Sequence, residues 1–345
     1  MSLDFNWLKE FKRIQLKKYI FISTIFIVIY GCEDKIVKPI PTFTNIIKSD
    51  IAKKYQLKSN SDIAKKYQLK SNGEAPLLVW SSKKQPNPDL IPPSIFYSPH
   101  QDDETLGMGA SIAEHVRIGR PVYVVLFADG AGSTAINILN GKEKCSSHNT
   151  FHHFNLSRKD FINARNNEFI AACKKLGAHR IYIVNNGKGV DESIGLKNMI
   201  VRFKNLIYYF QKKYPNISHK LISGNSDYSC SGENCNTYTR SDSHKAGDIA
   251  INNLYDLGLV KDVRLYKIYI FSSCYSERQR IANWKKPVSS SDMLRKQEAC
   301  DEYKLFKPEI GRFAIAYDHS VWEYFSNSYS SKYEYVVYPI NEVKK

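Results

Sequence analysis

Short apolar runs alternate with longer amphipathic segments from about residue 88 onwards. The runs are rich in Val, Ile, Tyr and Phe, as is typical of buried strands, whereas the longer segments have a helical period. We expect strands at 95–97, 121–127, 180–184, 220–222, 265–271 and 333–337, and helices at 105–118, 157–176, 192–213, 244–257 and once more within 285–345. This alternation predicts an α/β domain over 88–345, with a mainly parallel sheet and helices on both faces.

The N-terminal pattern differs and is typical of an export signal. Basic residues between 9 and 18 precede an apolar run over 19–30, which suits a signal-peptide core better than a membrane span. The segment 29–32 reads Ile-Tyr-Gly-Cys and resembles a bacterial lipoprotein cleavage box. It implies removal of residues 1–31 and lipid attachment at Cys32, and so an exported, membrane-anchored protein, periplasmic or at the cell surface. An uncleaved anchor or an ordinary buried cysteine is the alternative.

Residues 32–87 are expected to form a flexible, Lys-rich tether. Within them, residues 49–60 are repeated without a change as residues 61–72. Two copies of a twelve-residue unit are too few for a solenoid, and their polar composition fits a linker. The alternative is a basic strip that lies on anionic lipid.

The net charge of +16 suggests acidic partners. About half of this excess lies before residue 90, and no nucleic-acid-binding motif is present, so we expect a membrane or cell-wall surface and no nucleic acid. Export permits disulfides, and Cys230 with Cys235 is the foremost candidate pair. A zinc site at these two cysteines is the weaker alternative, because no second Cys/His pair stands nearby.

The chemistry centres on the segment 98–107, Ser-Pro-His-Gln-Asp-Asp-Glu-Thr-Leu-Gly, where a strand is expected to end and a helix to begin. His100 and Asp103 can point at one metal ion, while Asp102 projects differently and can take a proton from a water there. The alternative is that Asp102 and Asp103 merely complement the dipole of a helix start. One histidine, two aspartates and one glutamate together at the end of a strand favour the metal site.

This segment resembles the Ala/Ser-His-Pro-Asp-Asp-Glu hallmark of the PIG-L/LmbE-like deacetylases. The resemblance continues at 127–130 (Phe-Ala-Asp-Gly) and at 164–177, where an Arg-x-x-Glu helix ends in Leu-Gly. It implies a Rossmann-like fold and zinc-dependent removal of acetyl from N-acetylglucosaminyl groups. It also implies that His100 and Asp103 bind Zn²⁺ and that Asp102 is the general base.

By the same resemblance His244 is the third zinc ligand, because Ser241 to His244 stands where the family has His-Pro-Asp-His. Ser241 replaces the first of those histidines, which leaves the general acid open. His319 is a candidate replacement for it. Arg165 resembles a substrate-contacting arginine, with a surface pair to a nearby glutamate as the alternative, and Asp191 is a weaker substrate-binding candidate. The histidines at 148, 152 and 153 lie in a polar loop that could border the site.

The sequence therefore predicts a membrane-tethered, zinc-dependent hydrolase that deacetylates an N-acetylglucosamine-type sugar of a glycan or glycolipid. Two alternatives stay open. One is an amidase or deacylase that acts on another N-acyl substrate. The other is a degenerate carbohydrate-binding lipoprotein that has kept the metal but lost turnover. The absence of a histidine at Ser241 favours this second alternative, and the presence of Asp102 speaks against it.

Overall fold

The computed structural model divides into two compact units, Met1–Lys58 and Ser59–Lys345. It describes residue 69 and residues 75–224, 241–268, 284–317 and 322–337, which all belong to the second unit. Among these described residues, no helix has the length and apolar character needed to cross a bilayer.

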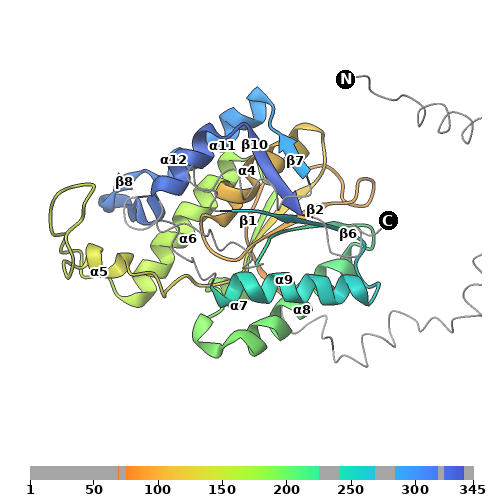
Figure 1. The fold of residues 1–345 in the computed structure, drawn as a ribbon, viewed down its shortest axis with the longest axis horizontal. Helices are drawn as coiled ribbons and strands as arrows, with labels where there is room; N and C mark the ends of the chain where they lie inside the picture. Colours follow the sequence, from red (N-terminus) through yellow and green to blue (C-terminus); the bar gives the residue numbers. More distant parts are fainter. Residues whose placement is uncertain (1–68, 70–74, 225–240, 269–283, 318–321, 338–345) are drawn as a thin grey trace, which may run out of the picture. The chain divides into compact units, whose positions relative to one another are not determined.

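An eight-stranded mixed sheet, drawn as arrows in Figure 1, forms the centre of the second unit. Its strands are β1 (Leu77–Ser81), β2 (Ser94–Ser98), β3 (Val122–Leu126), β4 (Arg180–Ile183), β5 (Ser218–Ile222), β6 (Asp262–Tyr266), β7 (Trp284–Pro287) and β10 (Tyr333–Val337). Their order across the sheet is β1-β4-β3-β2-β5-β6-β10-β7. The five strands from β4 to β6 are parallel, and β1, β10 and β7 join them antiparallel. The predicted α/β fold with a mainly parallel, Rossmann-like sheet is therefore confirmed.

The strand order places a topological switch point between β2 and β5. From β2 the chain proceeds outward to β3 and β4 on one side, and afterwards to β5 and β6 on the other. In open α/β sheets the crevice beyond the carboxyl ends of such strands is the usual ligand site. The segment that follows Ser98 at the end of β2 therefore lies where the fold favours a ligand.

Helices cover both faces of the sheet, as Figure 1 shows. They are α4 (Asp103–Arg117), α5 (Ala135–Leu139), α6 (Arg158–Lys175), α7 (Val184–Gly187), α8 (Leu196–Lys213), α9 (Asp242–Asp256), α11 (Ser290–Tyr303) and α12 (Trp322–Ser330), with 3₁₀ turns at Glu192–Ile194 and Pro308–Ile310 and a small hairpin of β8 (Phe306–Lys307) and β9 (Arg312–Phe313). Strand β2 shows why two layers form. Ile95 and Tyr97 pack in the core with α8 and α9, whereas Phe96 between them packs in the core with α4, α6 and α11.

The sheet extends beyond what the sequence pattern predicts at both ends. Residues 77–81, assigned to the tether, form β1 and pair with β4, so the folded part begins before residue 88. The predicted strand at 333–337 is β10, but the C-terminal segment also contains two α-helices, α11 and α12, instead of one, and the unpredicted strands β7, β8 and β9. Short antiparallel edge strands carry little periodic signal, which explains why β1 and β7 were not predicted.

The second copy of the repeat also contacts the domain. Leu69 is partly buried against the core that faces α8 and α9. Because the two copies are identical, Leu57 stands at the equivalent position of the first copy. Deletion of either copy therefore leaves the same sequence before the domain, with a leucine at the place of this contact.

A carboxylate near the C-terminus holds the middle of α4. Glu334 in β10 is buried and accepts hydrogen bonds from the backbone N–H groups of Ala110 (2.7 Å) and Ser111 (2.9 Å). The hydroxyl of Ser328 in α12 donates to the carbonyl of Leu106 at 2.9 Å. The helix that begins at Asp103 is therefore fixed in part by residues more than two hundred positions later in the chain.

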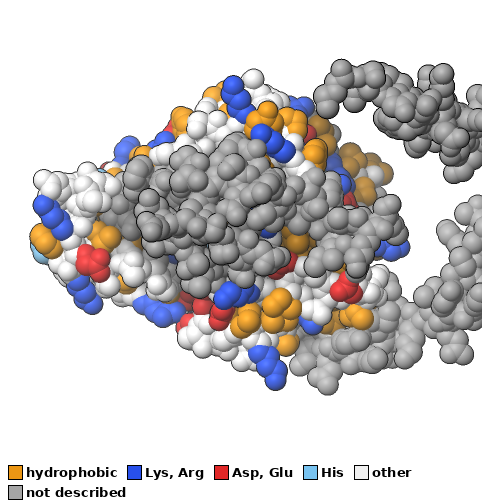
Figure 2. Space-filling model, viewed as in Figure 1, with side chains coloured by type: hydrophobic (Ala, Val, Ile, Leu, Met, Phe, Trp, Pro, Cys, Tyr) orange, Lys and Arg blue, Asp and Glu red, His pale blue; other side chains and the backbone are white. Residues whose placement is uncertain are grey.

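Where the described residues are visible in Figure 2, Lys and Arg side chains are scattered among acidic and hydrophobic ones. Of the cysteines, Cys173 and Cys300 are buried thiols outside any disulfide. The proposed pair Cys230–Cys235 lies outside the described residues.

Candidate metal centre and active site

The turn between β2 and α4 is held in an unusual backbone conformation. Asp102 precedes the helix with φ 124° and ψ −34°, a region that non-glycine residues rarely adopt. Such strain costs about 1–3 kcal/mol and persists where the surrounding structure imposes it, often at functional sites. The constraint here comes from Glu104, whose carboxylate accepts the backbone N–H of Asp102 at 3.2 Å.

Glu104 connects this turn to two other elements. Its Oε2 accepts the hydroxyl of Ser98 at 3.3 Å, and its Oε1 accepts the hydroxyl of Tyr303 in α11 at 2.8 Å. Burial raises the pKa of Glu104 to about 7, against the hydrogen bonds that lower it. Glu104 is thus a positioning residue within the motif, a role that the sequence reading did not assign.

Three of the predicted residues converge on one point. Ligand atoms of His100, Asp103 and His244 all lie within 4.8 Å of one another. Asp103 Oδ2 lies 3.0 Å from His244 Nε2 and 3.6 Å from His100 Nδ1. Asp103 and His244 are almost fully buried, and His100 is partly exposed. The structure therefore presents a His/Asp/His group suited to a metal ion, assembled from the ends of β2 and the start of α9.

Each histidine of this group is oriented by a partner on its other ring nitrogen. His100 Nε2 lies 3.0 Å from Ser243 Oγ and 3.1 Å from Glu192 Oε1. Burial raises the pKa of Glu192, but the hydrogen bond and charge of His100, together with Ser243 and His244, outweigh this and lower the pKa to about 2. His244 Nδ1 lies 2.7 Å from Ser241 Oγ. Such outer contacts fix the ring orientation of metal-binding histidines.

Ser241 consequently has a structural explanation. It precedes α9 and holds His244 so that Nε2 faces Asp103. The sequence identified Ser241 only as a replacement for a histidine. The sequence did not indicate Glu192 as a functional residue. Its contact with His100 exists only in the folded chain. An acidic residue at the expected start of a helix is also common and gives no specific signal.

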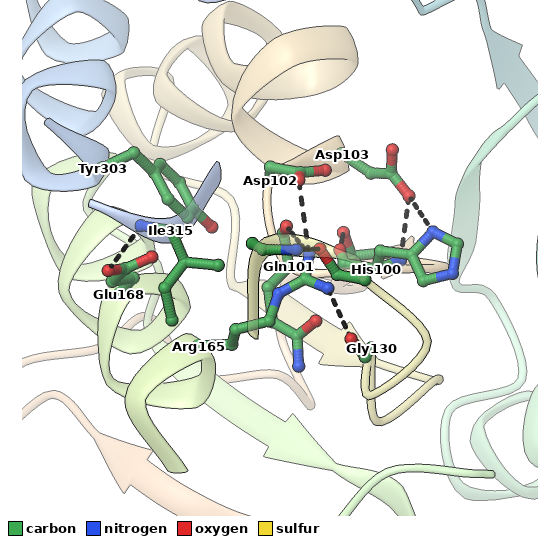
Figure 3. Close-up of polar contacts among 12 residues, drawn as sticks. His100, Gln101, Asp102, Asp103, Gly130, Arg165, Glu168, Tyr303 and Ile315 are labelled. Carbon is green, nitrogen blue, oxygen red and sulfur yellow. Dashed lines mark hydrogen bonds and ion pairs between the residues drawn. The ribbon is translucent and has the colours of Figure 1, made fainter. Parts of the chain in front are cut away.

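Asp102 lies beside this group with one oxygen available. Its Oδ2 is 3.5 Å from Arg165 Nη2, whereas its buried Oδ1 accepts no hydrogen bond from the residues that the structure describes (Figure 3). Burial raises the pKa of Asp102 and the nearby Asp103 raises it further, while Arg165 acts in the opposite direction. A carboxylate with a raised pKa and an available oxygen is suited to accept a proton.

Arg165 of α6 is itself tightly held. Nη1 donates to the carbonyl of Gly130 at 2.7 Å and Nη2 donates to the carbonyl of Gln101 at 3.1 Å (Figure 3). A methyl group at Gly130 would approach Arg165 Nη1 to 2.5 Å, so only glycine permits this contact. Arg165 is therefore fixed in a position where its Nη2 contacts Oδ2 of Asp102. Its predicted contact with substrate stays a prediction.

The surface pair offered as the alternative for Arg165 is wrong. Both Arg165 and Glu168 are buried, and Glu168 accepts the backbone N–H groups of Phe313 at 3.2 Å and Ile315 at 3.1 Å. Burial raises the pKa of Glu168 to about 7, although these two hydrogen bonds oppose the rise. Glu168 thus connects α6 to the segment after β9.

Asp191 directly precedes Glu192, the partner of His100, and its side chain is about half exposed. Its Oδ2 and the Oδ2 of Asp129 each lie 3.0 Å from Arg158 Nη2. Arg158 thereby joins the ends of β3 and β4, and the sequence reading gave it no role. The substrate-binding role of Asp191 stays a prediction. His319 and Cys32 lie outside the described residues.

Comparison with known proteins gives one match to a family model and several similar solved structures. The family model described as "PIG-L: GlcNAc-PI de-N-acetylase" matches residues 95–222. No curated protein sequence matches the chain. Among solved structures, similarity extends to a triple mutant of a deacetylase of the teicoplanin biosynthetic pathway, with 15% identity, 71% of this chain and 98% of that chain covered, and a TM-score of 0.46. It extends to the N,N'-diacetylchitobiose deacetylase of Pyrococcus horikoshii (13% identity, 88% and 95% covered, TM-score 0.39). It also extends to the 4-carboxy-2-hydroxymuconate hydratase of Pseudomonas putida (15% identity, 71% and 96% covered, TM-score 0.42).

The segment matched by the family model includes β2, the motif with His100, Asp102 and Asp103, and the helix with Arg165. These are the residues on which the resemblance was recognised, and they lie together at the switch point of the sheet. Over residues 95–222 the chain matches the model of the PIG-L family of de-N-acetylases.

Proposed function

We propose that this protein is a zinc-dependent N-deacetylase that acts on an N-acetylglucosamine-type sugar of a glycan or glycolipid. One observation carries the proposal. The donor atoms of His100, Asp103 and His244 converge beside the available Oδ1 of Asp102. A metal-binding group and a proton acceptor that can serve it are thus adjacent at the ligand-binding edge of the sheet.

The donor set fits zinc. Two imidazole nitrogens and one carboxylate oxygen make a common set for catalytic zinc, which takes three protein ligands and leaves a fourth position for water or substrate. The 3.0 Å between Asp103 Oδ2 and His244 Nε2 is near the separation of about 3.3 Å that tetrahedral bonds of about 2.0 Å impose. A zinc ion bound there would polarise the acetamide carbonyl and lower the pKa of a water molecule to about 7.

Other residues of the site transfer the proton or orient the side chains that act in the reaction. Asp102 Oδ1 accepts the proton of the attacking water, and Arg165 holds Oδ2 so that Oδ1 stays oriented. Ser241, Ser243 and Glu192 hold the two histidines in place. Hydrolysis releases acetate and a free amine, which must gain a proton. Asp102 can return the proton that it has taken, and His319 is the second candidate for this step.

Support for the amino-sugar substrate comes from the description of the matched family model, which names a GlcNAc lipid. A lipid anchor at Cys32 would hold the domain beside a glycolipid or cell-wall substrate outside the cytoplasm. Both the substrate class and the anchor are parts of the proposal.

Acetate release from a panel of N-acetylglucosamine glycans and glycolipids tests this function. The purified protein is assayed after removal of metal by a chelator and again after addition of zinc. We expect acetate only in the presence of zinc and only from N-acetylated sugars. Release of a longer acyl group, or of acetate from non-sugar amides alone, would contradict the substrate. Zinc binding without any hydrolysis would favour a carbohydrate-binding protein.

A further inference from the structure

A second group of metal-binding side chains lies in the loop between α5 and α6. Atoms of Cys145, His148 and His152 lie within 4.8 Å of one another. Cys145 is buried, His152 is partly exposed and His148 is exposed. In Figure 1 this loop projects at the left beside β8, and at the same edge Figure 2 shows histidine surface. From the sequence, His148 and His152 were expected in a polar loop that could border the active site.

We propose that these three residues bind a second zinc ion, separate from the His100/Asp103/His244 site. Cys145 Sγ lies 3.4 Å from His148 Nδ1, and this nitrogen lies 3.2 Å from His152 Nε2. Zinc bonds of about 2.3 Å to sulfur and about 2.0–2.1 Å to nitrogen, set at tetrahedral angles, separate S from N by about 3.5 Å and N from N by about 3.3 Å. Two of the three separations between these atoms therefore match those that one zinc ion requires, and the third is within 4.8 Å.

The backbone of the loop favours this arrangement. The ligands follow a Cys-x₂-His-x₃-His spacing, close to that of structural zinc sites. Cys145 donates its N–H to the carbonyl of Thr150 at 2.8 Å, and the N–H of His148 points to Cys145 Sγ at 3.4 Å. A hydrogen bond from an N–H group to the sulfur stabilises the thiolate, which is the form that binds metal.

The neighbours of His148 and His152 indicate which parts of the chain a bound metal would hold together. The ring of Phe306 in β8 lies 4.3 Å from the ring of His148 and 5.4 Å from that of His152. Asn140 closes the neck of the loop through two hydrogen bonds to the backbone of Leu156, at 2.7 and 3.0 Å. Zinc would thus fix the loop against β8, immediately before the helix that carries Arg158.

A cysteine–histidine nucleophile is the competing chemistry for Cys145. Full burial of Cys145 and the approach of a second imidazole to the first favour the metal. No step of the proposed deacetylation uses this site, so it can be tested separately from that activity.

Cobalt substitution of the full-length protein provides the test. Cobalt bound to a thiolate gives a charge-transfer band in the near ultraviolet, whereas the His100/Asp103/His244 site has no sulfur and cannot give this band. We expect one equivalent of cobalt to produce the band, and Cys145→Ser to abolish it. The matched controls Cys173→Ser and the double variant Cys230→Ser/Cys235→Ser should retain it.

Metal analysis gives an independent readout. The wild type should hold two zinc ions per chain, and both Cys145→Ser and Asp103→Asn should hold one. Because His148 is exposed, His148→Asn should leave the fold intact and weaken cobalt binding at the sulfur site at least tenfold. A band that persists in Cys145→Ser, a copper ion in place of zinc, or unchanged binding in His148→Asn would overturn the proposal.

Discussion

Replacement of Asp102 by asparagine separates metal binding from proton transfer. Asparagine has the same shape but cannot take a proton from water. Loss of a general base typically lowers turnover about 10²- to 10⁴-fold, which corresponds to about 3–5 kcal/mol of barrier. Zinc should stay near stoichiometric, because the ligand group consists of His100, Asp103 and His244.

The fold should tolerate this substitution. The contact between Asp102 Oδ2 and Arg165 is long, at 3.5 Å, and Arg165 retains the carbonyls of Gly130 and Gln101. Burial already raises the pKa of Asp102, so loss of its charge also removes a desolvation cost. The two effects oppose each other, and we expect the free energy of unfolding to change by about 1 kcal/mol or less.

Asp103→Asn is the matched control, because it makes the same change at the neighbouring position. Asp103 Oδ2 accepts the backbone N–H of His100 at 2.8 Å and lies 3.0 Å from His244 Nε2. This variant should lose both the zinc ion of the His100/Asp103/His244 site and the activity. Metal analysis, acetate release and thermal melting on the same preparations distinguish the two variants. Wild-type turnover in Asp102→Asn would refute its role as the base, and full zinc at this site in Asp103→Asn would refute the ligand set.

Four further predictions concern the surroundings. Ser241→Ala should weaken zinc binding at the His100/Asp103/His244 site about 10- to 100-fold, because the contact that orients His244 is lost. Equilibrium dialysis measures this change. Folded Glu168 keeps its proton up to about pH 7 and the unfolded chain loses it near the usual 4.5, so wild-type stability should fall as pH rises through this window. Denaturant titration of Glu168→Gln should show a smaller fall, with a difference of up to about 3 kcal/mol between pH 5 and pH 8; an equal pH dependence in both proteins would contradict this. Deletion of 61–72 should leave the melting temperature unchanged, whereas deletion of 49–72 should lower it by about 2–4 °C. Mass spectrometry of the mature protein should find a diacylated or triacylated Cys32, and an intact N-terminal methionine in the membrane fraction would contradict lipidation.

The parts of the site that the sequence could predict are those encoded locally. His100, Asp102 and Asp103 occupy one strand-to-helix turn, so their types and spacing suffice to suggest a metal and a base. His244 was found through the resemblance, since nothing local connects it to that turn. The parallel core of the sheet was predictable because its strands are buried on both faces and read as apolar runs.

The remaining parts depend on contacts between distant segments. Glu192 and Ser241 act on the histidines only after β4 and α9 have come together at the switch point. The strand β1 pairs at an edge and none of its five residues is buried, so its short apolar run shows no alternation of buried and exposed positions. The approach of Cys145 to two histidines depends on the reversal of the chain between Cys145 and Thr150, which the sequence alone did not indicate.

The contact between Glu334 and α4 has a consequence for the order of events during synthesis. At about 5–20 residues per second, the ribosome makes Glu334 on the order of ten seconds or more after Asp103. Until then the backbone amides of Ala110 and Ser111 lack the carboxylate that holds them. Until β10 has been made, the nascent chain therefore has an α4 that lacks two of the hydrogen bonds that hold it in the folded domain. A fragment that stops at residue 222, where the family match ends, would contain the motif without the strand that fixes its helix.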